Sequence, residues 1–67
     1  MGMNVVFEVL IAKLNNHRKH LDDATITMID QLIETGEEPD DSQKEILYQT
    51  ERRLRRDLGD QEFFRRP

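Results

Sequence analysis

Residues 32–45 read LIETGEEPDDSQKE, and this stretch decides the fold because it holds the signals that end one helix and begin another. Gly36 follows a run with helical spacing and suits the positive φ that a helix C-terminus often requires. Pro39 comes three residues later and cannot continue the helix. Ser42 and Glu45 have the spacing of a capping box, in which each side chain accepts a hydrogen bond from the backbone N–H of the other residue. This pattern predicts a helical hairpin.

The hairpin is expected to turn at residues 36–41, and its second arm is predicted to be a helix over residues 42–58 that ends at Gly59. The residues that would face a neighbour form a narrow seam with two flanking members: Leu47, Thr50, Leu54 and Leu58, with Ile46 and Tyr48 beside them. A seam this narrow is typical of a coiled-coil contact rather than of a face that covers a globular core.

The first arm carries apolar residues at helical spacing over residues 7–32. They are Phe7, Leu10, Ile11, Leu14, Leu21, Met28, Ile29 and Leu32. One interpretation is a single long helix over residues 4–34. The other is two helices, over residues 4–20 and 23–35, with a break near residues 21–23.

Local chemistry favours the break. Weak helix formers gather just before it: Asn15, Asn16, His17 and His20. Asp22 is well placed to cap the next helix, because Leu21 and Ile26 then have the spacing of a hydrophobic staple. The first arm is therefore predicted to consist of two helices.

The expected fold is all-α: a small helical hairpin or three-helix unit in which residues 1–59 form a single domain. Residues 60–67 show no helical period, so a loosely ordered C-terminal tail is expected there.

Self-association into a helical bundle is also expected. A chain of 67 residues buries only about 60% of the surface that its unfolded form exposes, and without cysteine it has no disulfide to supplement its core. Oligomerisation or docking onto a partner is the remaining common supplement. The candidate residues for such a contact are the apolar ones near the start of the first arm: Val6, Phe7, Leu10, Ile11 and Leu14.

The residue patterns of most enzyme classes are missing from the sequence. The three glycines are isolated, so there is no glycine-rich phosphate loop, and Ser42 lies in no strained nucleophile turn. His17 and His20 could share one helix face, but a third metal ligand at fixed spacing is lacking. The acidic residues 34–41 lack the ligand positions of a calcium loop. We expect no catalytic residues, no metal site and no cofactor.

Charge is distributed unevenly along the chain, whose net charge is -4. Residues 1–50 are acidic overall, whereas residues 51–67 hold six arginines. A candidate contact for an acidic or phosphate-bearing partner consists of Arg52, Arg53, Arg55 and Arg56 with Phe63 and Phe64. The alternative is that these arginines complement the helix dipole and solvate the end of the helix.

The expected function is that of a small non-enzymatic interaction or regulatory protein, which acts through protein–protein contacts of amphipathic helices. Its partner would be another protein or a second copy of the chain. The alternative is a small dimeric nucleic-acid-associated regulator that uses the arginine-rich C-terminal region, although the acidic remainder would repel phosphates. No apolar run approaches the roughly 20 residues that span a bilayer, and no signal-peptide pattern is visible, so a cytoplasmic protein without membrane contact is expected.

Overall fold

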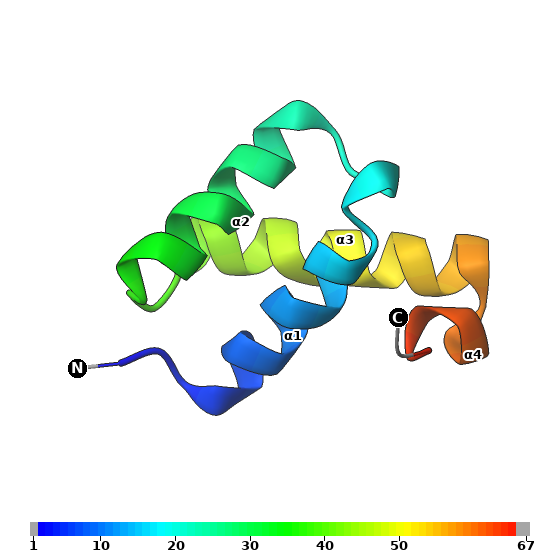
Figure 1. Ribbon diagram of the computed structural model, residues 1–67, viewed down its shortest axis with the longest axis horizontal. Helices are drawn as coiled ribbons and strands as arrows, with labels where there is room; N and C mark the ends of the chain where they lie inside the picture. The colour runs from blue at the N-terminus through cyan, green and yellow to red at the C-terminus, as the bar shows by residue number, and fades with distance from the viewer. Residues whose placement is uncertain (1, 66–67) are drawn as a thin grey trace.

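The computed structural model of the chain describes residues 2–65, and within that range every regular element is a helix (Figure 1). In order along the chain the elements are α1 (Val5–Asn16), a 3-10 turn (Arg18–His20), α2 (Asp23–Thr35), α3 (Asp41–Leu58) and α4 (Asp60–Phe63). Helix α1 packs against both α2 and α3, while α4 folds back against α3. The expected all-α helical unit is confirmed.

The break in the first arm is confirmed and lies between α1 and α2. Helix α1 ends at Asn16, four residues before the predicted end, because the N–H of His17 donates to the carbonyl of Leu14 at 3.0 Å and tightens the chain into the 3-10 turn. Asp22 then caps α2 as predicted: its Oδ1 accepts a hydrogen bond from the backbone N–H of Thr25 at 2.8 Å.

The hairpin turn begins at the predicted residue. Gly36 has φ 69°, in the left-handed region, and its N–H donates to the carbonyl of Leu32 at 2.9 Å. A residue with a Cβ is strained in this conformation, so glycine is the natural choice.

The predicted capping box at Ser42 and Glu45 is wrong by two residues. Asp40 caps α3 instead: the N–H of Gln43 donates to Asp40 Oδ1 at 2.8 Å, and the N–H of Asp40 donates to Gln43 Oε1 at 2.9 Å. Asp and Gln serve this motif as well as Ser and Glu do, and the earlier start lets the N–H of Lys44 donate to the carbonyl of Asp40 at 2.8 Å.

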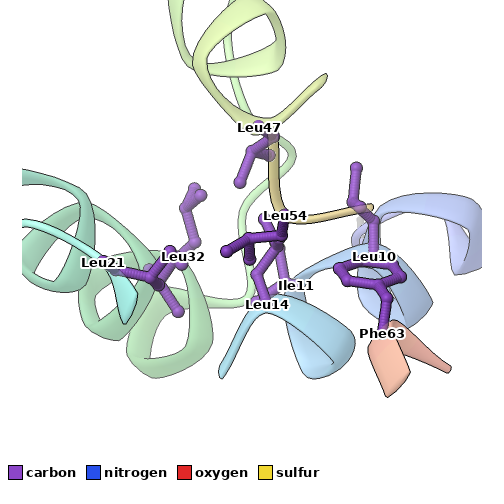
Figure 2. Packing of buried hydrophobic residues seen from close by; sticks show 9 residues of the cluster. Leu10, Ile11, Leu14, Leu21, Leu32, Leu47, Leu54 and Phe63 are labelled. Atoms are coloured by element: carbon purple, nitrogen blue, oxygen red, sulfur yellow. The ribbon is translucent and has the colours of Figure 1, made fainter. Parts of the chain in front are cut away.

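The core collects side chains from all four helices and the turn before α2 (Figure 2). Its buried members are Leu10, Ile11, Leu14, Leu21, Ile29, Leu32, Leu47, Leu54 and Phe63. The predicted seam of α3 holds, since Leu47, Thr50 and Leu54 are buried. Ile46 and Tyr48 flank the seam and remain 41% exposed.

The expectation of a loosely ordered tail is wrong for its first residues. Gly59 ends α3 with φ 84° and turns the chain back, so that α4 places Phe63 in the core with 0% exposure. The ring of Phe63 stacks on that of His17 at 5.6 Å, and His17 Nε2 donates to the Phe63 carbonyl at 3.0 Å. Phe63 is a single buried side chain and does not form a repeating pattern, so the spacing of hydrophobic residues did not predict its burial. Arg66 and Pro67, the last of the predicted tail, lie outside the described residues.

Replacing Phe63 tests whether α4 belongs to the folded unit. We expect Phe63→Ala to lower the free energy of unfolding by about 3–5 kcal/mol, because it removes a fully buried ring. Phe64→Ala is the matched control, since Phe64 is 47% exposed and should cost far less. Urea unfolding followed by circular dichroism measures both, and equal losses would contradict the docking of α4.

The cap of α2 predicts a pH dependence of stability. Hydrogen bonds from the side chain and then the backbone N–H of Thr25, together with the charge of Arg53, hold the pKa of Asp22 below its ordinary 3.8. A lowered pKa in the folded state stabilises the fold above the unfolded pKa, and this contribution is lost as the pH falls through the folded value. We expect Asp22→Asn to flatten the loss of stability between about pH 5 and pH 2, whereas Asp23→Asn should not. Urea midpoints measured across this range would refute the role of Asp22 if both variants kept the wild-type slope.

Candidate interaction surface

The residues predicted for self-association lie mostly inside the chain's own core. Phe7, Leu10, Ile11 and Leu14 are 8%, 6%, 3% and 0% exposed. Only Val6, at 59%, is available to a partner. Because the break before α2 lets α1 turn its most apolar face onto α2 and α3, those four side chains are buried within the single chain.

A different set of apolar side chains remains exposed. Val5, Val6 and Val9 of α1 are 65%, 59% and 54% exposed, and they lie in one groove with Tyr48 of α3 and Phe64 at the end of α4. We call this the valine groove; its lining is Val5, Val6, Val9, Leu10, Lys13, Tyr48, Glu51 and Phe64. Contiguous exposed apolar side chains with a polar border are typical of interaction sites.

Tyr48 and Glu51 form the α3 wall of the valine groove and belong to a stripe of that helix that continues beyond the groove. Lys44, Tyr48, Glu51 and Arg55 follow one another at three- or four-residue intervals and therefore share a face of the helix. Tyr48 approaches Phe7 with ring centroids 6.0 Å apart, which joins this wall to the buried face of α1.

Two lysines lie at or beside the valine groove: Lys13 is part of its lining, and Lys44 lies over Phe7, the ring that contacts Tyr48 of the lining. Lys44 Nζ lies 5.2 Å from the ring centroid of Phe7, near the start of α1, and Lys13 Nζ lies 5.9 Å from that of Phe64, near the end of α1. Among residues 2–65, neither lysine has a carboxylate within ion-pair distance. The groove is therefore mainly apolar, with Glu51 in its lining, and neither Lys13 nor Lys44 forms an ion pair with a described residue.

Arg55 is held differently, because it has a partner. Its Nε lies 2.9 Å from Asp60 Oδ1, and its guanidinium lies 5.2 Å from the Phe64 ring centroid. The hydrogen bond and charge of Arg55 lower the pKa of Asp60, and those of Asp60 raise the pKa of Arg55. This pair fixes the end of α3 beside α4 and keeps Phe64 at the edge of the groove.

Neither stability nor helix propensity accounts for the three exposed valines. Valine is a weak helix former because its branched side chain is restricted against the preceding turn. At these positions more than half of each valine remains exposed, so burial within the chain is incomplete. Contact with another molecule would supply the burial that the folded chain does not.

The arginine and phenylalanine cluster predicted from sequence is divided by the structure. Phe63 is in the core, while Phe64 and Arg55 border the valine groove. The other three arginines (Arg52, Arg53 and Arg56) line a separate shallow groove with Gln49 on another side of α3. The predicted residues therefore do not form a single surface.

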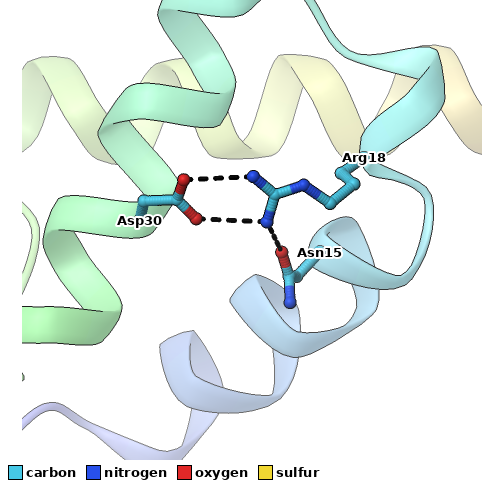
Figure 3. Close-up of polar contacts among 3 residues, drawn as sticks. All are labelled: Asn15, Arg18 and Asp30. Carbon is cyan, nitrogen blue, oxygen red and sulfur yellow. Dashed lines mark hydrogen bonds and ion pairs between the residues drawn. The ribbon is translucent and has the colours of Figure 1, made fainter.

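The contact of the 3-10 turn with Arg53, one of these three arginines, was not predicted from the sequence. Arg53 Nη2 donates to the carbonyl of His20 at 3.2 Å, so the basic turn residues lie next to the arginine-lined side of α3. Arg18 is already engaged, since its Nη1 and Nη2 bind the two carboxylate oxygens of Asp30 at 3.2 and 3.1 Å (Figure 3). Its Nη1 also donates to Asn15 Oδ1 at 2.9 Å. The contact between Arg53 and His20 joins residues 33 positions apart, which helical periodicity cannot detect.

The two histidines do not make a metal centre with their surroundings. Their rings are 6.3 Å apart, and His17 uses Nε2 to hold the carbonyl of Phe63. Within residues 2–65 no three side chains of His, Cys, Asp or Glu lie close enough together to hold a metal ion.

Comparison with known proteins adds no relative: no family model, curated protein or solved structure matches the chain. Over the described residues, none of the helices combines the length and the apolar character needed to cross a bilayer.

Paired substitutions separate the valine groove from the core. We expect Val9→Ser to change the free energy of unfolding by no more than about 0.5 kcal/mol, because its side chain is 54% exposed. Leu14→Ala, on the buried side of the same helix, should lower it by about 2–5 kcal/mol. Thermal and urea unfolding of both variants checks this, and a large loss in Val9→Ser would place the valines in the core.

Proposed function

We propose that this chain is a non-enzymatic interaction module that binds another protein through the valine groove. The proposal is based on five exposed apolar side chains that share one groove: Val5, Val6, Val9, Tyr48 and Phe64. None of them belongs to the buried core cluster. As expected from the sequence, the cytoplasm remains the proposed location.

The size of the valine groove suggests a moderate affinity. Full burial of an aliphatic or aromatic side chain contributes about 1.5–3 kcal/mol, and the five side chains are already about half covered. Their remaining burial offers on the order of 5 kcal/mol, whereas a micromolar complex requires about 8 kcal/mol. Charged contacts at the rim would have to add to it, which suits a reversible, regulatory contact.

Self-association is the weaker form of this proposal. The sequence-based expectation depended on Phe7, Leu10, Ile11 and Leu14, which the chain's own core already uses. In the valine groove the exposed apolar side chains are the three valines and two aromatic residues, and this smaller surface favours a different protein over a second copy.

A nucleic-acid-associated regulator is the second candidate, and one observation favours it. Arg52, Arg53 and Arg56 line one groove of α3, and Arg53 also holds the carbonyl of His20 at the end of the basic 3-10 turn. Arg56 lies 3.4 Å from Asp57, however, and the net charge of -4 opposes binding of a polyanion. We therefore favour the protein-binding function over the nucleic-acid-binding function.

One experiment distinguishes the two candidates. The immobilised chain is used to capture partners from an extract of its own cells, and we expect Val9→Asp to reduce the captured protein about tenfold or more because a carboxylate then occupies the apolar groove. Ile46→Asp is the matched control, since Ile46 is an exposed aliphatic residue outside the groove. It should capture the same protein as the wild type.

The double variant Arg52→Ala/Arg56→Ala tests the second candidate in the same experiment. Loss of captured nucleic acid in this variant, with retention by Val9→Asp, would favour the nucleic-acid regulator. Unchanged capture by all variants would overturn both candidates.

A further inference from the structure

We infer that the ligand of the valine groove is a short amphipathic helix of another protein, with aliphatic side chains at its centre and a carboxylate at each end. This inference rests on the proposed function, because it specifies the chemistry of the partner segment for the same groove.

The length of the groove sets the size of the ligand. Its α1 wall runs from Val5 to Lys13, a rise of about 12 Å, which equals roughly two turns of helix. Side chains of α1 and α3, two helices that cross in contact, line the trough into which an amphipathic helix can lay its apolar face (Figure 1). Aliphatic residues at positions i, i+3 or i+4, and i+7 of the ligand would reach the three valines, Tyr48 and Phe64.

Charge sets the ends of the ligand. Lys44 lies over Phe7, beside Tyr48 and near the start of α1, and Lys13 lines the groove over Phe64, near the end of α1, at 5.2 and 5.9 Å from the ring centroids. Neither has an ion-pair partner within the described chain, and both are half-buried, so each stem covers apolar surface. Two carboxylates about seven residues apart on a ligand helix would meet the two ammonium groups.

The middle of the groove disfavours negative charge. Glu51 lines it between Tyr48 and Phe64 and is itself half-buried. A ligand carboxylate placed there would face a like charge, so an apolar centre between acidic ends matches the groove better than an evenly acidic segment.

A second copy of the chain is a poorer occupant on the same grounds. In a dimer with a twofold axis through the centre of the groove, Lys13 of one copy would lie near Lys44 of the other copy. Those like charges oppose pairing at both ends, and each copy also carries a net charge of -4.

The test uses the full chain and two synthetic helical peptides with the same central leucines, one with glutamate and the other with lysine at both ends. Fluorescence anisotropy of the labelled peptides measures binding. We expect the glutamate peptide to bind about tenfold more tightly than the lysine peptide at low salt, with the difference shrinking as salt is added. Val9→Asp should weaken the binding of both peptides.

Charge reversal supplies the decisive control. In the double variant Lys13→Glu/Lys44→Glu, the lysine peptide should bind more tightly than the glutamate peptide. In the double variant Lys13→Gln/Lys44→Gln, the two peptides should bind about equally. The second variant is the milder change and serves if the first does not fold. Lys19→Glu changes an exposed lysine on the 3-10 turn, outside the groove, and should leave the preference unchanged.

Several results would overturn the inference. Equal binding of both peptides to the wild type would refute the charged ends while leaving the proposed function intact. Binding of neither peptide up to about 1 mM would refute a helical ligand of this class, and the proposed function would then be judged by the capture experiment alone. A dimer in sedimentation that Val9→Asp dissociates would show that a second copy occupies the groove.

Discussion

The reversal of the chain between α1 and α2 is the constraint on which the rest of the structure depends. The 3-10 turn and the Asp22 cap separate two helices that hydrophobic spacing alone would allow to be one. Because of this reversal, α1 packs against both α2 and α3, and its most apolar face becomes core (Figure 1). An unbroken helix would leave that face uncovered, since α3 has only 18 residues with which to cover it.

The docking of α4 completes both the core and the valine groove. Phe63 fills the space under the end of α1 and is held there by stacking on His17 and by a hydrogen bond from His17 Nε2 to its carbonyl. The next residue, Phe64, packs edge-on against it at 5.0 Å and so lies at the edge of the groove. The same short helix thereby buries one aromatic side chain and presents the other to solvent.

Local signals in the sequence predicted the element boundaries well where the chemistry is specific to one residue. Gly36 and Gly59 both adopt positive φ at helix ends, and Asp22 is an N-cap. The prediction at Ser42 failed because Asp40 and Gln43 satisfy the same hydrogen-bonding pattern two residues earlier. Two equivalent caps in one stretch cannot be ranked by pattern alone.

The candidate site was less predictable than the fold. Periodicity identified Val6 among the residues for a contact, but it grouped this valine with four side chains that the core takes up. It also grouped Arg55 with arginines that face another side of α3. Which side of an amphipathic helix stays exposed depends on where its neighbours lie, and that information is carried by long-range packing.

The sequence by itself determined that the chain is all-helical, where the hairpin turns and that the first arm breaks, because these features follow from local propensity, glycine conformation and capping. Only the tertiary structure decided that Phe63 belongs to the core and that three valines of α1 remain exposed in a groove with Lys13. Both depend on the angles at which α1 and α4 meet α3, and these angles arise from the mutual packing of side chains far apart in the chain.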